Sequence, residues 1–351
     1  MEETHSRLKT TALVFLIILG IAVTFVILKV LQDIFVPLVV AYFLFFIFMP
    51  LNSYLRKIKF PVWTAIIIDL LIMMLVMGIV SWFIIAEFGS FWDKLPEYEN
   101  RINKTISGAA ISFGIRDPSL RNFQLRELSQ QIDFGTIAGN AFASTFSFLG
   151  NFLIMFILFA FIVPGHPIIY NALEKRFADK KTFSDTFQEI SVQVRKYFSS
   201  KVIISVITAF AEGLTVYLFG VDFAVVWGVL IFFLNFIPGI GSLIALSLPC
   251  LLALAIFDSL LKVIIMVIVL VIMDTILGNI IEPLMFGDRM EMNPLIIILS
   301  LLIWGYVWGV LGALLSVPIM AIFKIIISRS RSVNLILIND LMDKKKPQIR
   351  P

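Results

Sequence analysis

Three acidic residues lie inside long apolar stretches of the chain: Glu212, Asp274 and Glu282. An ionised carboxylate in an apolar medium is costly unless it faces a cavity or a partner. A carboxyl group can also take up and release a proton, so these three residues are candidates for ion coupling. Asp69 is a fourth acid of this kind, closer to the edge of its apolar stretch. Structural hydrogen bonding is the alternative interpretation for all four.

One long apolar stretch, 223–257, is interrupted by the sequence "FIPGIG" at 236–241. As a single helix the stretch would be about 50 Å long, whereas the hydrocarbon core of a bilayer is about 30 Å thick. It is therefore too long for one span and too short for two. Pro238 removes a backbone donor, and Gly239 and Gly241 permit a tight reversal. The pattern predicts a re-entrant helical hairpin.

The last apolar block, 294–327, repeats this arrangement with tryptophans and glycines near its middle, and a proline follows each break, at Pro249 and Pro318. Irregular backbone at membrane depth is tolerated where it is buried in protein or lines a cavity. Transporters use the freed backbone groups at such breaks to bind substrates or ions. A packing kink without a ligand is the alternative. The candidate substrate or gate residues are Asn235, Pro238, Gly239, Gly241, Trp304, Gly305, Gly309 and Gly312.

Composition places the whole chain in a membrane. Of its 351 residues, 60% are hydrophobic and 15% are charged, which is more apolar surface than a soluble domain can cover. The sequence predicts an all-α, polytopic helical membrane protein with about eight membrane segments, two of them re-entrant or broken hairpins. The apolar windows are 11–28, 34–50, 61–86, 146–164, 201–219, 223–257, 259–281 and 294–327.

Lysine and arginine residues orient these segments, because cytoplasmic loops carry an excess of them. Both termini, the turn at 51–60 and the segment 165–200 are basic, so we expect them in the cytoplasm. The expected organisation begins with a cytoplasmic N-terminus (1–10), three transmembrane helices (11–86), an extracytoplasmic helical segment (87–145) and a fourth transmembrane helix (146–164). A cytoplasmic amphipathic helix (165–200), a transport core with two broken or re-entrant segments (201–327) and a cytoplasmic tail (328–351) follow.

Two segments outside the expected spans have helical periodicity. The cytoplasmic one, 165–200, has a basic polar face and predicts one helix, or two broken near 182–184, that contacts membrane lipids. The extracytoplasmic one, 87–145, predicts helices near 93–111 and 119–132, on either side of an "RDP" turn.

Several classes of function lack the residues they need. Cys250 is a single cysteine, which excludes disulfide frameworks and cysteine-based zinc sites. His5 and His166 lie outside the expected spans, so an intramembrane serine has no histidine base. No nucleotide-binding or zinc-protease motif is present. We therefore expect no enzyme activity, cofactor, metal site or nucleic-acid partner, and any active transport would have to be driven by an ion gradient.

Four motifs resemble those of one membrane protein family, the AI-2E (autoinducer-2 exporter-like) transporters. They are "NFIPGIG" followed by Pro249, "IEPLMFG" at 281–287, "NPL" at 293–295 and "WGVLGALLSVPIMA" at 308–321. The resemblance extends from about 11 to 327, and the spacing of the four motifs together is specific. Gly239 stands where the family often has an aromatic residue after the proline.

The resemblance implies a multi-pass secondary carrier (a permease) of the bacterial cytoplasmic, or inner, membrane. It also suggests a homo-oligomer, a pentamer being one candidate. Family members are associated with export of the quorum-sensing furanone signal, and others with exchange of sodium or lithium for protons. The leading hypothesis is an ion-coupled exporter of a small polar organic molecule. The alternatives are a Na⁺(Li⁺)/H⁺ antiporter and a membrane scaffold that transports nothing.

Overall fold

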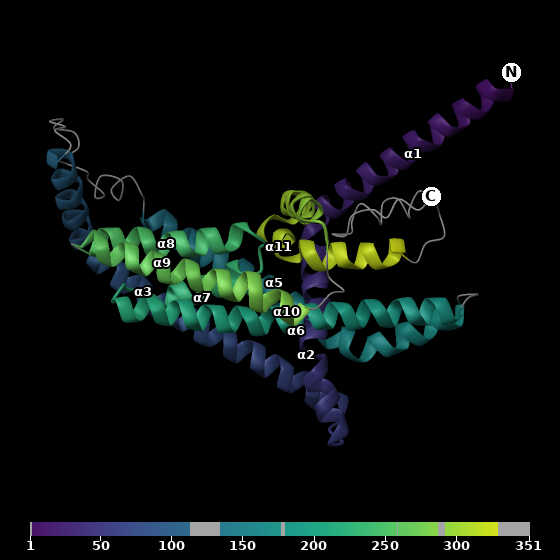
Figure 1. The fold of residues 1–351 in the computed structure, drawn as a ribbon. Coiled ribbons are helices and arrows are strands. Elements are labelled where there is room, and N and C mark those ends of the chain that lie inside the picture. The colour runs from purple at the N-terminus through teal and green to yellow at the C-terminus, as the bar shows by residue number, and fades with distance from the viewer. Residues whose placement is uncertain (1, 113–133, 177–179, 258, 287–291, 329–351) are drawn as a thin grey trace. The chain divides into compact units, whose positions relative to one another are not determined.

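The computed structural model describes residues 2–112, 134–176, 180–257, 259–286 and 292–328, and these form a succession of helices (Figure 1). Their bounds are α1 Glu2–Val30, α2 Gln32–Lys57, α3 Val62–Ser112, α5 Phe134–Arg176, α6 Lys180–Phe219, α7 Ala224–Leu234, α8 Ile240–Ile256, α9 Leu260–Ile276, the π-helical turn η2 Leu277–Ile281, α10 Glu282–Phe286 and α11 Pro294–Ser328.

The fold confirms a polytopic helical membrane protein. Among the described residues, six helical stretches are long and apolar enough to cross a membrane. They are Gln32–Lys57, Val62–Phe83, Phe152–Arg176, Ser184–Phe219, Leu260–Phe286 and Pro294–Ser328. Large apolar side chains such as Phe210, Leu218 and Leu243 are exposed on the helices, as expected of surfaces that contact lipid.

The helices run further than the apolar windows that predict them. The expected outer helix near 93–111 is the continuation of α3, which is unbroken from Val62 to Ser112. The second expected outer helix, 119–132, and the tail beyond 328 lie outside the described residues. α6 passes without interruption through 182–184 and continues into the span expected at 201–219. The expected amphipathic segment, 165–200, is therefore divided between two helices: its first part, to Arg176, ends α5, and its part from Lys180 onward shares α6 with the span at 201–219.

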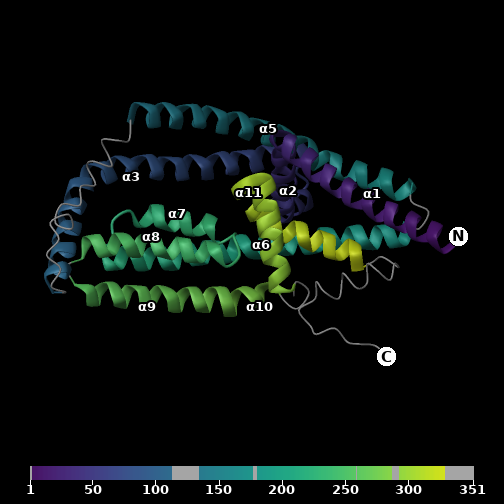
Figure 2. The same ribbon diagram turned by 90° about the horizontal axis from the view of Figure 1, so that it is seen from above.

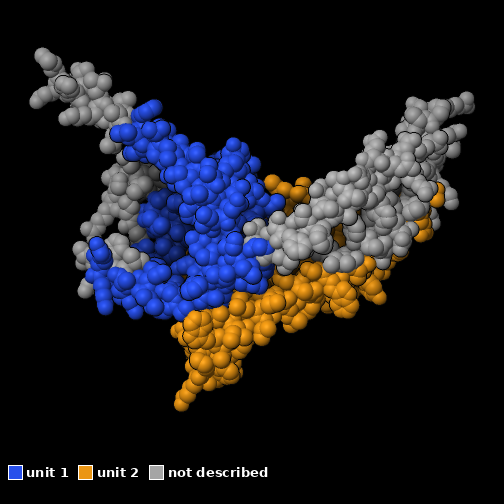
Figure 3. Space-filling model, turned by 180° about the vertical axis from the view of Figure 1, so that it is seen from behind, with its two compact units in different colours: residues 1–45, 150–190, 292–351 blue, residues 46–149, 191–291 orange. Residues whose placement is uncertain are grey.

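The chain divides into two compact units (Figure 3). Unit 1 contains 1–45, 150–190 and 292–351, and unit 2 contains 46–149 and 191–291. The predicted acids and the first predicted hairpin belong to unit 2. The second predicted hairpin belongs to unit 1.

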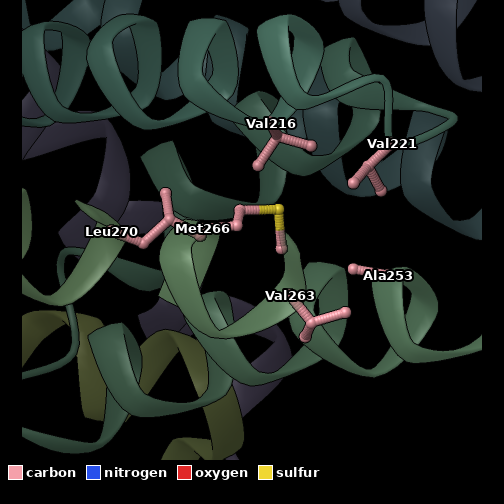
Figure 4. Packing of buried hydrophobic residues seen from close by; sticks show 6 residues of the cluster. All are labelled: Val216, Val221, Ala253, Val263, Met266 and Leu270. Atoms are coloured by element: carbon pink, nitrogen blue, oxygen red, sulfur yellow. The ribbon is translucent and has the colours of Figure 1, made fainter. Parts of the chain in front are cut away.

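In unit 2, α7, α8 and α9 run beside the C-terminal half of α6 (Figures 1 and 2). Contacts of α7 with α8, of α8 with α9, and of α3 with both α7 and α8 hold the bundle together. Its apolar core lies where α6 ends and α8 and α9 face each other (Figure 4), and Cys250 packs against it. The core residues are Val216, Val221, Ala253, Val263, Met266 and Leu270.

Unit 1 has a smaller core around the middle of α11. Trp304, Val307 and Trp308 are buried there against apolar residues of α1 and α2. The indole N–H of Trp308 donates a hydrogen bond to the carbonyl oxygen of Leu28, at 3.0 Å. The ammonium group of Lys29 donates to the carbonyl oxygen of Tyr306 at 3.3 Å and lies 3.5 Å from the centre of its ring. The C-terminal end of α1 therefore holds the middle of α11.

Candidate functional site

The sequence "FIPGIG" forms the turn of a helical hairpin, as predicted. α7 ends at Leu234, α8 begins at Ile240, and the two helices pack against each other. Gly239 has a φ of 71°, which a side chain disfavours. A Cβ on Gly241 would lie 1.8 Å from the carbonyl oxygen of Leu234, so the end of α7 touches the start of α8 at a position that admits only glycine.

A second helical reversal occurs within α11. The chain leaves helical geometry at Trp308 and Gly309, where Gly309 has a φ of 64°, and it changes direction there (Figure 2). The hydroxyl of Ser300 donates to the carbonyl oxygen of Ser316 at 2.9 Å, so the two halves of α11 lie side by side.

The two reversals close in the same way. A Cβ on Gly312 would lie 1.9 Å from the carbonyl oxygen of Trp304, which matches the contact of Gly241 with Leu234. Gly305 and Ala313 also approach each other across the second hairpin. Pro249 and Pro318 are fully buried within the returning helices. The internal repeat read from the sequence therefore corresponds to a repeated hairpin.

One face of α6 carries a line of buried polar side chains. Lys201, Ser205, Thr208, Glu212 and Thr215 follow one another at intervals of three or four residues, which places them on a single helical face. Lys201 is 5% exposed, Ser205 is 0% exposed and Glu212 is 1% exposed. Helices that cross membranes bury polar groups at a cost, so a continuous polar line on one face indicates a functional surface.

Opposite this line lie the end of α9 and the short helix α10. The ammonium group of Lys201 donates to a carboxylate oxygen of Glu282 at 2.6 Å, and both side chains are largely buried. Tyr197, one turn before Lys201, stacks on Phe286, one turn after Glu282, with ring centres 5.3 Å apart. This stacking fixes α10 against α6, so the ion pair sits on a supported surface.

Asp274 joins the same cluster from the last turn of α9. The charge of Lys201 acts on Asp274, and the charge of Asp274 acts on Glu212. Further along, the hydroxyl of Thr215 donates to the sulfur of Met273 at 3.2 Å. The three predicted coupling residues therefore lie in one cluster, together with a buried lysine.

The π-helical turn η2 explains how Asp274 and Glu282 face the same lysine. An α-helix advances about 100° per residue, so eight residues would leave the two side chains about 80° apart around the axis. A π-turn accommodates one extra residue. The eight-residue separation then turns through about the same angle as seven α-helical residues. The angle around the axis between the side chains of Asp274 and Glu282 falls to about 20°. η2 lies between the two acids, at Leu277–Ile281, and aligns them.

The turn of the first hairpin is tied to this cluster on both sides. Before the turn, the amide of Asn235 donates to the hydroxyl oxygen of Ser205 at 3.0 Å. After the turn, the side chain of Ser242 interacts with the carboxylate of Asp274. The broken backbone and the buried charges thus form one site within unit 2.

Small residues bring α7 close enough to α6 to complete the site. A Cβ on Gly213 would lie 3.3 Å from the Cα atom of Gly228, and a Cβ on Gly228 would lie 3.3 Å from the carbonyl oxygen of Ala209. Crossings of this kind let membrane helices approach backbone to backbone.

Outside the expected spans, one face of α3 holds the ends of the hairpin. Lys94 forms an ion pair with Asp222, which precedes α7, and the hydroxyl of Tyr98 donates to the same carboxylate at 2.8 Å. Burial, together with this hydrogen bond to Asp222, raises the pKa of Tyr98, which therefore remains a donor. Arg101 donates to the carbonyl oxygen of Ile256 at the end of α8. The C-terminal part of α3 thus anchors both arms of the hairpin.

The structure brings together some of the predicted site residues and separates others. Glu212, Asp274, Glu282 and Asn235 meet in unit 2 beside the turn that contains Pro238, Gly239 and Gly241. Trp304, Gly305, Gly309 and Gly312 form the second hairpin in unit 1. Sequence reasoning missed Lys201, Ser205 and Ser242 as members of the cluster, although the polar spacing on α6 was visible in the sequence.

Charge balance indicates what the cluster can do. Three carboxylates and one ammonium group leave two negative charges when all four groups are ionised. One oxygen of Glu212, Oε1, is buried and has no hydrogen-bond partner among the described residues. Uncompensated charge at such depth is costly, so protons or cations are needed to balance it.

Comparisons with known proteins agree with a role in transport. A "Putative transport protein" of Borreliella burgdorferi is 26% identical over 308 residues, which cover 85% of this chain and 82% of that protein. "Putative transport protein YhhT" of Escherichia coli (strain K12) is 27% identical over 300 residues, covering 84% of each chain. "AI-2 transport protein TqsA" of the same strain is 25% identical over 305 residues, covering 85% of this chain and 86% of the relative.

The sequence profile described as "AI-2E family transporter" matches residues 13–332, which include every helix of the candidate site. With this match over most of its length, the chain belongs to the AI-2E transporter family.

Proposed function

We propose that the chain is a secondary transporter that couples proton movement to the export of a small polar organic molecule, with an autoinducer-2-like signal as the leading candidate. The observation that carries the proposal is the contact of a broken helical hairpin with a buried cluster whose charges do not balance. The relative named as an AI-2 transport protein supports the choice of substrate.

In this proposal Asp274 links proton binding to the hairpin. In its charged form it interacts with the side chain of Ser242 and is attracted to Lys201. A proton on Asp274 cancels its charge, weakens both interactions and leaves Lys201 paired with Glu282. Because Ser242 directly follows the turn, protonation changes the forces on the hairpin. Glu212 is the second proton acceptor in this proposal, because the charge of Asp274 acts on its carboxyl group.

Location and assembly complete the proposal. We propose that the protein acts in the bacterial inner membrane, as its family suggests, with both termini in the cytoplasm, as the distribution of lysine and arginine favours. We further propose that it works as a homo-oligomer, for which a pentamer is the first arrangement to test.

Reconstituted vesicles test the function directly. Purified protein is placed in liposomes that contain a pH-sensitive dye, and an autoinducer-2-like furanone, Na⁺ or Li⁺ is added outside. We expect the furanone to drive proton movement in the wild type and in Asp185→Asn, which changes an exposed acid of α6. We expect no such movement in Asp274→Asn, which retains size and hydrogen bonding but loses the titratable proton.

The other outcomes decide between the alternatives. Proton movement in response to Na⁺ or Li⁺ but not to the furanone would identify an antiporter that uses the same carboxylates. No proton movement under any condition, in protein shown to be folded, would contradict coupled transport and favour a scaffold. Full activity of Asp274→Asn would remove this residue from the coupling mechanism.

A further inference from the structure

A fourth acid, Asp69, is buried apart from the cluster, near the turn between α2 and α3. The turn ends α2 with two backbone hydrogen bonds, from Phe60 N–H to the Leu55 carbonyl and from Lys59 N–H to the Arg56 carbonyl, both at 3.0 Å. Lys59 adopts a φ of 65°, which completes the common Schellman arrangement of a helix C-terminus. This turn brings Asn52 of α2 next to Asp69 of α3.

Asp69 is enclosed by the protein. Its exposed fraction is 0% and that of Asn52 is 7%. Ile66 and Met73, which share the face of α3 on which Asp69 lies, are buried and apolar. The side-chain amide of Asn52 donates to Oδ2 of Asp69 at 2.8 Å.

Two oxygen atoms of this pair remain unsatisfied. Oδ1 of Asp69 and Oδ1 of Asn52 are both buried, and neither has a hydrogen-bond partner among the described residues. Both are acceptors when Asp69 is ionised, so they cannot satisfy each other in that form. Buried polar atoms nearly always have a hydrogen-bond partner, so two oxygen atoms without one, on adjacent side chains, require an explanation.

No opposite charge compensates Asp69 in the described part of the chain. Among the described residues, the side chain that interacts with the carboxyl group of Asp69 is that of Asn52, a neutral amide. α7 and α8, which pack against α3, carry no charged residue, and Cys250, the ionisable group of α8, belongs to the apolar core of unit 2. On α2, Arg56 and Lys57 are exposed. An ionised Asp69 would therefore be a buried and unpaired charge.

We propose that Asp69 is a proton-binding site, held as a neutral carboxylic acid in a cyclic pair with Asn52. The proton resides on Oδ1 of Asp69 and is donated to Oδ1 of Asn52, while the amide of Asn52 donates to Oδ2 of Asp69. One proton thus neutralises the buried charge and turns Oδ1 of Asp69 into a donor for Oδ1 of Asn52, so both unsatisfied oxygen atoms gain a partner. The acid then takes part in two hydrogen bonds.

This site has a function different from that of the coupling cluster. None of the interactions described for Asp69 involves Lys201, Glu212 or Asp274. Loss of the proton creates a buried negative charge and removes one of the two hydrogen bonds of the Asp69–Asn52 pair. The junction of these helices is therefore closed by a proton and loosened when the proton leaves.

Infrared spectroscopy of the full-length protein tests the proposal, because a protonated carboxyl group has a C=O stretch that a carboxylate lacks. The background is Glu212→Gln with Asp274→Asn, which removes two of the three cluster carboxyls and keeps Glu282, the one that is ion-paired with Lys201. At neutral pH we expect a protonated-acid band in this background. The band should disappear on adding Asp69→Asn and persist on adding the control Asp185→Asn. Absence of the band in the background protein would overturn the proposal.

A second variant keeps the test decisive if the triple variant does not fold. In wild-type protein, Asn52→Ala removes the partner of the acid, so the protonated-acid band should move toward that of a free acid. A protonated-acid band whose position is unchanged by Asn52→Ala would contradict the cyclic pair. A carboxylate band that depends on Asp69 and shifts with Na⁺ would show that a cation, and not a proton, occupies the site, and would also overturn the proposal.

Discussion

Lys201 determines how many ionised acids the buried cluster can hold. It forms an ion pair with Glu282, and its charge also acts on Asp274. Removing one partner of a buried ion pair leaves an uncompensated charge and costs more than removing both. The pair should therefore behave as a unit.

We expect Lys201→Met to destabilise the protein by about 3 kcal/mol, because Glu282 loses its partner in a largely buried position. The double variant with Glu282→Gln should recover most of that loss. Lys196→Met, which changes an exposed lysine on the same helix, serves as the control. Thermal unfolding in detergent gives the stability of the wild type and of these three variants. A double variant as unstable as Lys201→Met would show that the lysine acts through other contacts.

Some residues of the site could be found from the sequence and others could not. Glu212 and Asp274 stand out because a charge in an apolar segment is rare at any position. Lys201 ends a run of lysines and arginines that resembles a surface segment, and its burial depends on Glu282, 81 residues later. The hydroxyls of Ser205 and Ser242 are common in membrane helices and become informative only when their partners are known.

At the scale of the helices, the two hairpins depend on glycine for two different reasons. Gly239 and Gly309 have a positive φ, whereas Gly241 and Gly312 lack space for a side chain. The sequence indicated the turns but could not separate these reasons, because the space depends on how closely the two arms pack.

We expect Gly241→Ala to cost about 3 kcal/mol, because its Cβ would overlap the carbonyl oxygen of Leu234 and force the arms apart. Gly239→Ala should cost about 1 kcal/mol, since open space surrounds it and only the backbone conformation is strained. Gly78→Ala, in an open position of α3, should be neutral or stabilising. Equal losses for the two hairpin variants, measured by thermal unfolding, would contradict this distinction.

The π-turn η2 leads to a prediction about deletion. Removing Gly278 should convert η2 into ordinary α-helix with Asp274 and Glu282 about seven steps apart, which preserves their common face. The deletion protein should fold and keep the Lys201–Glu282 pair. Deleting Val267, within the regular part of α9, should instead rotate the following acids by about 100° and disrupt the cluster.

The measurement is the destabilisation caused by Lys201→Met in each deletion background. It should be as large in the Gly278 deletion as in the full-length chain, and small in the Val267 deletion. Loss of the effect in the Gly278 deletion would show that η2 does more than align the two acids. Periodicity alone could not reveal η2, because the residues at 277–281 differ little from those of an apolar α-helix.

At the scale of the whole molecule, helix order agrees with the apolar windows of the sequence. Every window overlaps a helix or hairpin of the structure, since long apolar segments have few alternatives in a membrane. The division into two units could not be foreseen, because it depends on contacts between segments far apart in the chain. Orientation in the membrane is a separate property, which rests on the distribution of charge.

The orientation can be tested with two introduced cysteines. Cys250 is the single native cysteine, so Cys250→Ala gives a cysteine-free background. Asn100 is exposed on the C-terminal part of α3, and Arg176 is exposed at the end of α5. We expect Asn100→Cys to react with a membrane-impermeant maleimide in intact cells. Arg176→Cys, within the basic segment at 165–200, should react only after the membrane is opened.

This pair is informative because each position controls for the other. Both side chains reach solvent, so a difference in labelling reports the side of the membrane and not burial within the protein. Asn100 also lies close to Tyr98 and Arg101, the residues that anchor the first hairpin. Labelling from outside therefore places the open ends of α7 and α8 at the outer surface, and their turn enters the membrane from that side. The reverse labelling pattern would invert this direction, with the hairpin opening toward the cytoplasm.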